Sequence, residues 1–407
     1  MESRQVNPHL SKKNSSGDRY DLAIVGAGVV GLAHAWRAAE RGLRVLVLDR
    51  RPYGSGASIR NFGMIWPVGQ TKAGLWSTAM KSRELWLDLA KKAGVPIHEC
   101  GSLHMAFRDD EWAVLEEFQV KQGAEYGTEL ISAEAVHQKT PAANPEGLIG
   151  ALWSPTEMRV NPRVAIAAVP SLLIDQYDVS VEFSTTVIRV GDGEVEAADG
   201  RRWQADHTII CSGADFANLF PQTHQDAGLF NCKLQMLRTA PQPGGMQIGP
   251  HLAGGLTLRH YEAFRICDSL KPLCERVSRE TPELDRYGIH VMASQTDEGE
   301  VVLGDSHQYG DEIEPFDQAE IENLMLRELH RIIRLPDWTV QQRWHGYYAK
   351  SSKKPIVFEQ PRPDVTIVNG LSGAGMTLSM GVGEEVIARL VSDQTIGKKE
   401  GEEIHVG

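Results

Sequence analysis

Three glycines near the start of the chain have the spacing of a phosphate-binding turn. Gly26, Gly28 and Gly31 follow the pattern G-x-G-x-x-G, in which the glycines allow a tight turn, close approach of the backbone to a pyrophosphate, and close packing of a helix on a strand. The amides at the start of the following helix, together with its positive dipole end, attract phosphate. Asp49 follows the next apolar run, where a carboxylate can accept hydrogen bonds from a ribose. These residues predict a bound dinucleotide.

The segments around the turn have the patterns that it requires. Residues 22–25 form an apolar run that predicts a buried strand, and a helical pattern continues from the glycines to Arg41. Gly42 ends this helix, and residues 44–48 form a second apolar strand. A strand, a glycine turn, a helix and a second strand in this order are much more specific than three glycines alone.

The end of the chain has a similar pattern of strand, glycine-rich turn and helix. Residues 365–369 read as a strand, a glycine-rich turn follows, and residues 377–391 read as a helix. A helix beginning at Gly373–Met376 would place its positive dipole end where it can stabilise the negative charge of a reduced flavin; a plain tight turn is the simpler alternative. Two such turns favour FAD over NAD. The residues that we expect to bind FAD are Gly26, Gly28, Val30, Gly31, Asp49, Arg50, Ser58, Arg60, Asn61, Val187, Gly213, Gly373, Gly375, Met376 and Thr377.

The middle of the chain predicts a second domain. Between residues 232 and 341, strand-like segments, including 256–266, are separated by turns and interrupted by one amphipathic helix at about 318–331. We therefore predict an α/β protein, α+β overall, with a discontinuous Rossmann FAD-binding domain and a substrate domain containing a mixed or antiparallel sheet. The expected boundaries are a flexible tail at 1–19, a cofactor domain at 20–83, 155–231 and 340–395, and a substrate domain at 84–154 and 232–339.

The net charge, the cysteine pattern and the polar N-terminal residues argue against several kinds of partner and location. The 407 residues carry a formal net charge of −12, which argues against nucleic acid or an anionic membrane as the main partner. Five scattered cysteines show no C-x-x-C pair, so we expect a reducing compartment and no metal site. The first 19 residues lack an apolar core and do not resemble a signal peptide. We expect a cytoplasmic protein without a membrane span, and the oligomeric state stays open.

These motifs together resemble the D-amino-acid oxidase superfamily, which includes glycine oxidase and sarcosine oxidase. The resemblance extends from Tyr20 to about Leu390 and rests on GAGVVG with Asp49, GASIRNFG, NPR, TIICSGAD and GLSGAGMTLSMG. It implies a glutathione-reductase-like FAD-binding domain. The segments RNFGMIWPVGQ, KLQMLRT, GIHVMASQ, GDSHQYG and RWHGYYA resemble a subgroup associated with the catabolism of aminophosphonates such as 2-aminoethylphosphonate.

One departure from the family pattern concerns the substrate anion. Enzymes similar to glycine oxidase carry a G-x-R-P motif whose arginine pairs with the substrate carboxylate, whereas this chain has Tyr348 at the arginine position. Losing a charged, bidentate fork is not conservative, so the α-carboxylate is expected to be absent or held elsewhere. The nearby cations Arg343, His345, Lys350, Lys353 and Lys354 would suit a phosphonate, although a solvated basic loop explains the lysines more simply.

Other residues are candidates for contact with the amine. Asp305, His307 and Tyr309 would share one face of an extended segment, and His307 could accept the ammonium proton or orient the amine. Tyr261 and Tyr348 could orient the substrate, while Arg60 is either a relocated carboxylate anchor or a surface arginine. Sarcosine-oxidase-like relatives attach FAD to a cysteine near their C-terminal flavin segment. No cysteine follows Cys274, so we expect FAD to be noncovalent.

The expected reaction is oxidation of a small amine. A hydride equivalent would pass from the α-carbon to flavin N5, and water would hydrolyse the imine. The preferred substrate is 2-aminoethylphosphonate or its N-methyl form, giving phosphonoacetaldehyde, with oxygen or another carrier as the electron acceptor. Two alternatives stay open: a glycine, sarcosine or D-amino-acid oxidase, and a flavin-containing assembly component without turnover.

Overall fold

The computed structural model describes residues 19–310 and 313–393. The expected flexible tail lies almost entirely outside these residues. The described residues divide into two compact units, and each is made from separate stretches of sequence: 19–58, 163–229 and 349–393 contribute to the first unit, and 59–162, 230–310 and 313–348 to the second. Mixed α/β architecture is thus confirmed.

The first unit contains an eight-stranded mixed sheet with a parallel central part, and its strands come from the beginning, middle and end of the chain. Its strand order includes β12-β1-β2-β9, and β20 lies parallel to β12. Apolar side chains of these strands form the core, among them Leu46, Ile210 and Ile367. The strands are β1 (Arg19–Val25), β2 (Val45–Leu48), β9 (Ser180–Glu182), β10 (Val187–Gly191), β11 (Glu194–Ala197), β12 (Arg202–Ile210), β19 (Val357–Arg362) and β20 (Val365–Asn369).

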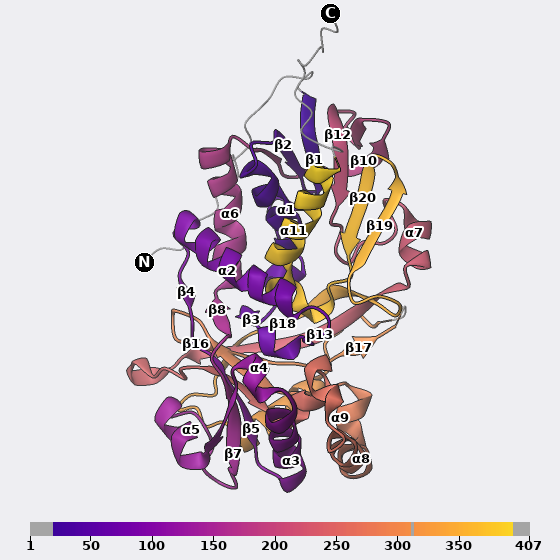
Figure 1. The fold of residues 1–407 in the computed structure, drawn as a ribbon. Helices are drawn as coiled ribbons and strands as arrows, with labels where there is room; N and C mark the ends of the chain where they lie inside the picture. Colours follow the sequence, from indigo (N-terminus) through magenta and orange to yellow (C-terminus); the bar gives the residue numbers. More distant parts are fainter. Residues whose placement is uncertain (1–18, 311–312, 394–407) are drawn as a thin grey trace, which may run out of the picture. The chain divides into compact units, whose positions relative to one another are not determined.

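The first unit also contains α-helices, of which the first and the last begin at glycine-rich turns. They are α1 (Val29–Ala39), α6 (Pro162–Tyr177), α7 (Pro221–Asp226) and α11 (Gly375–Ser392). Helices α1 and α11 lie side by side (Figure 1). A β-carbon added to Gly383 would come within 3.0 Å of the backbone of Ala33, so a glycine at this crossing lets the two helices approach closely.

The second unit is built on a nine-stranded sheet in the order β17-β13-β16-β15-β14-β5-β7-β6, with β18 paired to β13. Strands β14 and β5 are parallel and the neighbouring pairs are antiparallel, so the expected mixed sheet is confirmed. Its strands are β5 (Ser102–Ala106), β6 (Glu129–Ser132), β7 (Gly150–Ser154), β13 (Leu229–Pro241), β14 (His251–Gly254), β15 (Met292–Gln295), β16 (Glu300–Gly304), β17 (Gln308–Tyr309) and β18 (Val340–Ser351).

A smaller three-stranded sheet shifts the unit boundaries from those expected. Strands β3 (Met64–Ile65) and β4 (Ile97–His98) both pair with β8 (Met158–Val160). These pairings join residues 59–83 and 155–162 to the second unit, although we expected them in the cofactor domain. Residues 340–348 also fall in the second unit, because β18 pairs with β13.

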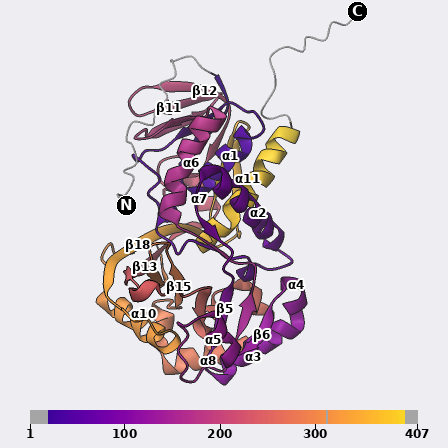
Figure 2. The same ribbon diagram turned by 90° about the vertical axis from the view of Figure 1, so that its left-hand side faces the viewer.

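The second unit also contains α-helices. They are α2 (Trp76–Ala93), α3 (Asp109–Phe118), α4 (Ala124–Tyr126), α5 (Ala133–Lys139), α8 (Leu270–Glu280), α9 (Pro282–Arg286) and α10 (Ala319–Ile332). Figure 2 shows α10 alongside the strands of this unit, and its buried residues, including Ile321 and Leu329, belong to the main core. Among the described residues, none of the helices combines the length and apolarity that crossing a lipid bilayer requires.

Two expectations for residues 256–286 were wrong. The segment 256–266, expected to be a strand, forms two 3-10 helices, Gly255–Arg259 and Glu262–Ile266, held by local bonds such as Phe264 N–H to Tyr261 O at 3.2 Å. The prediction of a single helix in this part of the chain missed α8 and α9. In α8 the buried residues Leu273 and Val277 have the four-residue spacing of a helix face.

Candidate functional site

The first glycine turn has the shape that a pyrophosphate requires. Gly26 has a φ of 110°, and a β-carbon there would lie 2.4 Å from the carbonyl oxygen of Cys211. A β-carbon on Gly31 would lie 1.9 Å from the carbonyl oxygen of Gly26. At Gly28 a β-carbon would meet only Ser58 Oγ, at 3.1 Å. The turn is therefore closed by backbone at two glycines and leaves the third approachable, which fits a dinucleotide.

Hydrogen bonds connect this turn to the residues after β2. The carboxylate of Asp49 accepts bonds from Ala27 N–H at 2.7 Å and Arg51 N–H at 2.8 Å. Ser58 Oγ accepts a bond from Val29 N–H at 2.9 Å, in the first turn of α1. The predicted acid and the predicted serine thus both lie against the glycine turn.

The second glycine-rich turn lies beside the first. A β-carbon on Gly375, where α11 begins, would be 3.8 Å from Val29 Cγ1, so the N-terminal ends of α11 and α1 are neighbours. Met376 and Thr377 follow as buried residues, and Gly373 lies in the 3-10 turn before α11. Two helix N-termini meeting at one place concentrate favourable dipole ends on a bound anion.

Four other predicted FAD contacts lie in the first unit, at Arg50, Val30, Val187 and Gly213. Arg50 is paired with Asp215 at 2.6 Å. The carbonyl of Val30 accepts a bond from His34 Nδ1 at 2.7 Å. Val187 is the buried first residue of β10. The carbonyl of Gly213 accepts a bond from Asn369 at 2.9 Å.

Arg60 and Asn61 belong to the second unit. Arg60 Nη1 donates to the carbonyl oxygen of His345 at 3.2 Å, and the side chain of Asn61 accepts a bond from Gly63 N–H at 2.8 Å. Their part in binding FAD stays a prediction.

The second unit gathers a group of ionisable side chains around His307. Its ring stacks on Tyr309, with centroids 5.9 Å apart and an interplanar angle of 6°, and meets Tyr348 edge-on at 6.1 Å. His307 Nε2 is 4.0 Å from Asp305 Oδ2. The structure therefore brings together Asp305, His307 and Tyr309 as the sequence indicated, although only Gln308–Tyr309 is a strand.

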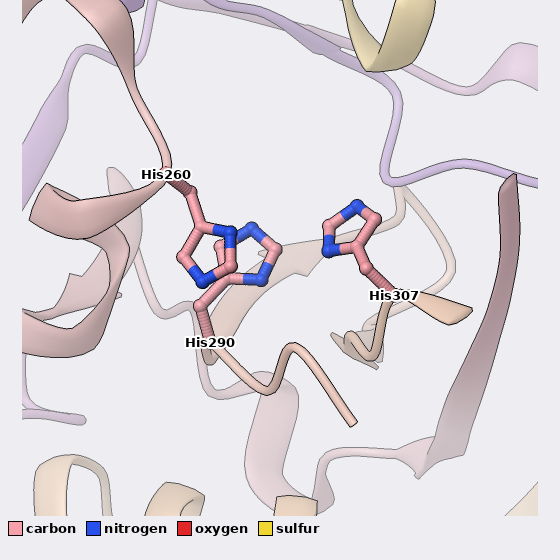
Figure 3. A group of neighbouring side chains, drawn as sticks. All are labelled: His260, His290 and His307. Carbon is pink, nitrogen blue, oxygen red and sulfur yellow. The ribbon is translucent and has the colours of Figure 1, made fainter. Parts of the chain in front are cut away.

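Two histidines that the sequence analysis did not single out complete this group (Figure 3). His260 stacks on His290 with ring centroids 4.1 Å apart, and His290 lies 4.8 Å from His307. His290 and Asp305 also exchange backbone hydrogen bonds of 2.9 and 3.3 Å. If residues 290–295 are paired antiparallel with 300–305, His290 and Asp305 lie opposite each other. Predicting this hairpin from the sequence could therefore have identified His290 as a neighbour of Asp305.

Burial controls the electrostatics of the group. It holds the pKa of His290 well below the ordinary value, and the nearby His260 and His307 lower that pKa further. Burial likewise raises the pKa of the Asp305 carboxyl well above its usual range. The pKa of Tyr348 is also raised well above that of an ordinary tyrosine, by burial and by Cys232 beside it. Burial therefore favours the neutral forms of His290, Asp305 and Tyr348.

Tyr261 is near this group but has packing contacts of its own. Its ring stacks on Trp66 at 5.9 Å and lies 6.5 Å from His290, and its hydroxyl donates to Met292 Sδ at 3.3 Å. Burial raises the pKa of its hydroxyl.

The expected surplus of positive charge is neutralised locally. Arg343 donates two bonds of 2.8 Å to Glu322 on an exposed surface, and His345 pairs with Asp317 at 2.8 Å. Lys354 pairs with Glu359, and Lys353 donates to the carbonyl oxygen of Asp226 at 2.7 Å. Glu322 and Asp317 lie 21 and 28 residues from Arg343 and His345, which is why the local sequence suggested that these two cations are free.

Comparison with known proteins supports FAD as the ligand of the two glycine turns. Residues 21–389 match the family described as FAD dependent oxidoreductase. Glycine oxidase of Geobacillus kaustophilus is 29% identical over 214 residues, which cover 49% of this chain and 56% of that protein. Glycine oxidase of Bacillus licheniformis is 24% identical over 54% of this chain and 61% of its own. The chain thus spans somewhat more than half the length of these two curated relatives.

Solved structures share the fold across nearly the whole chain. L-proline dehydrogenase from P. horikoshii aligns with a TM-score of 0.74 at 20% identity, covering 94% of this chain and 95% of that one. Glycine oxidase from Geobacillus kaustophilus aligns with a TM-score of 0.72 at 18% identity, covering 92% and 95%. Because the glycine turns fit the cofactor and the family match covers most of the sequence, this chain belongs to the FAD dependent oxidoreductase family, and its cofactor is FAD.

Proposed function

We propose that this protein oxidises a small amine and that its substrate is 2-aminoethylphosphonate or the N-methyl form. Oxidation of an amine is supported by relatives named as glycine oxidases, as part of an opine oxidase, and as gamma-glutamylputrescine oxidoreductase. FAD, when bound, accepts a hydride equivalent from the carbon next to the amine nitrogen. The residues of this chain bind and orient the substrate and hold its amine in the neutral form.

Tyr348 is the observation that carries the choice of substrate. It occupies the position at which the resembling glycine oxidases have an arginine, and its side chain packs with Leu234, Met236 and Val302. An uncharged phenol in an apolar cluster donates one hydrogen bond but cannot form the bidentate ion pair that an α-carboxylate requires. 2-Aminoethylphosphonate has no α-carboxylate, so its oxidation does not need the missing arginine.

The test is anaerobic reduction of the purified flavoprotein. We would add 2-aminoethylphosphonate, its N-methyl form, glycine and sarcosine separately and follow loss of the visible absorbance of oxidised flavin. We expect rapid bleaching by one or both aminophosphonates and slow bleaching by the two amino acids. Faster bleaching by glycine or sarcosine would refute the proposed substrate. Bleaching by none of the four would favour a different amine or a flavin-containing assembly component without turnover.

An amino-acid oxidase is the second candidate, favoured by the glycine oxidase relatives. Arg60 would then be the relocated carboxylate anchor. Its guanidinium has one bond to the His345 carbonyl oxygen at 3.2 Å, which leaves other N–H groups for a ligand. Changing Arg60 to Ala should then raise the KM for glycine strongly, whereas an unchanged KM would remove Arg60 from consideration.

A further inference from the structure

Three imidazole rings from distant parts of the sequence meet in the second unit. One ring nitrogen from each of His260, His290 and His307 lies within 4.8 Å of the other two. Figure 3 shows a nitrogen of His307 directed toward the other two rings. We call these three residues the histidine cluster.

Buried polar atoms beside the histidine cluster lack suitable partners. His290 and Asp305 are only 4% and 6% exposed. His290 Nδ1 and Asp305 Oδ1 lie 3.0 Å apart, yet neither atom has a partner aligned for a hydrogen bond. A buried polar group without a hydrogen-bond partner is destabilising. A metal ion bound through the other nitrogen of His290 would hold the ring so that Nδ1–H can donate to Asp305 Oδ1, which would satisfy both atoms.

We infer that His260, His290 and His307 bind a divalent transition-metal ion of the zinc class, with the carboxylate of Asp305 beside them. Imidazole nitrogen is a preferred donor for Zn²⁺, Cu²⁺ and Ni²⁺. Three protein ligands leave a further coordination position open, as in catalytic zinc sites. Metal binding requires neutral imidazole.

The ring nitrogens of the histidine cluster are somewhat further apart than the ligands of one metal ion, so binding requires a local movement of the rings. Zn–N bonds are about 2.0–2.1 Å, so two nitrogens on one tetrahedral ion lie about 3.4 Å apart. The limit of 4.8 Å between the ring nitrogens exceeds that value by an amount that rotation of an imidazole ring can remove. The Asp305 carboxylate next to His290 Nδ1 favours the orientation in which Nε2 faces the ion, as carboxylates do for other zinc-binding histidines.

A direct oxyanion site fits these groups less well. An anion placed in the histidine cluster would lie close to the carboxyl oxygens of Asp305, which are hydrogen-bond acceptors like those of the anion. A metal ion is instead attracted by that carboxylate. This inference gives His307 the role of a metal ligand in place of a proton acceptor.

The open position gives the ion a role in substrate binding. A phosphonate oxygen could occupy it, so that the metal supplies the positive charge which Tyr348 does not. This role alone rests on the proposed function, because metal binding itself needs no substrate.

The experiment measures zinc binding to the FAD-loaded protein after treatment with EDTA and removal of the chelator. Zn²⁺ would be titrated by calorimetry into the wild type, the triple variant His260→Asn, His290→Asn, His307→Asn, and the single variant His260→Asn. The control is His98→Asn, which removes an exposed histidine of the same unit that pairs with Asp297 at 2.6 Å. FAD content and thermal unfolding would show that each variant is folded, and the single variant keeps the test valid if the triple variant is not.

We expect one tight Zn²⁺ per wild-type chain, unchanged binding in His98→Asn, and loss of the tight site in the triple variant. Asp305→Asn should weaken binding by about 10–100-fold, as expected for a group that orients a ligand. No tight binding by the wild type, or equal binding by wild type and both histidine-cluster variants, would overturn the inference. Binding of inorganic phosphate but not Zn²⁺, lost in the triple variant, would also overturn it and assign the histidine cluster to an oxyanion. Because no amine is present, these outcomes are independent of the flavin-bleaching test.

Discussion

Gly31 packs so closely against Gly26 that a β-carbon on Gly31 would lie 1.9 Å from the Gly26 carbonyl oxygen. Backbone atoms cannot move aside as a flexible side chain can, so we expect Gly31→Ala to destabilise the first unit by more than the roughly 1–3 kcal/mol that is typical of overpacking. Thermal unfolding temperature and FAD content would both fall.

Gly28 and Gly56 provide matched comparisons for this variant. A β-carbon at Gly28 would meet only Ser58 Oγ, and at Gly56 it would meet nothing within 4 Å. Gly28→Ala should therefore stay folded but bind FAD more weakly, because its methyl group would occupy the approach of the pyrophosphate. Gly56→Ala should match the wild type in both measurements. Equal FAD affinity in Gly28→Ala and Gly56→Ala would contradict the assignment of the turn.

Ser58 caps α1 from a distant loop, because its Oγ accepts the bond from Val29 N–H at 2.9 Å. Ser58→Ala should lower the free energy of unfolding by about 1 kcal/mol, the usual effect of losing a helix cap. Denaturant unfolding would measure the change. Ser55→Ala removes a nearby exposed hydroxyl that bonds Arg51 at 3.1 Å and serves as the control. A loss of the same size in both variants would show that Ser58 has no special capping role.

His34 makes the stability of the protein depend on pH. It is buried in α1, and burial lowers its pKa from 6.5 to about 4. Between these values the unfolded chain binds more protons than the folded one, so folding stability falls as pH decreases from 6.5 toward 4. The pKa difference corresponds to roughly 3 kcal/mol. His34→Gln should reduce the pH dependence of unfolding across this range, although other buried histidines with lowered pKa values, such as His104 and His207, still contribute; His98→Gln should leave it as in the wild type.

Arg343 should contribute little to substrate binding, despite its place in a basic stretch. Its guanidinium is engaged by Glu322 through two bonds of 2.8 Å on an exposed surface. Arg343→Ala should therefore change stability by less than about 1 kcal/mol and leave the KM for 2-aminoethylphosphonate unchanged. Glu322→Ala is the matched variant. A large rise in KM caused by Arg343→Ala alone would return Arg343 to the substrate site.

The first glycine turn could be predicted from sequence because its residues are close together along the chain. Glycine spacing, the apolar strands on either side and Asp49 are all local features, and β1, α1 and β2 follow them. The identity of the cofactor followed from the same local features and from the resemblance, and the family match agrees with it.

The histidine cluster depends on pairings that sequence alone did not reveal. His260, His290 and His307 are separated by long intervals, and they meet because the hairpin of β15 and β16 and the turn after Arg259 bring them together. Ion pairs also depend on residues that are distant in sequence, since Arg343 in β18 is neutralised by Glu322 in α10. Local sequence determined the cofactor turn through short-range backbone geometry, whereas only the tertiary structure decided which ionisable groups are buried together and which are paired, because burial and charge pairing depend on neighbours that are distant along the chain.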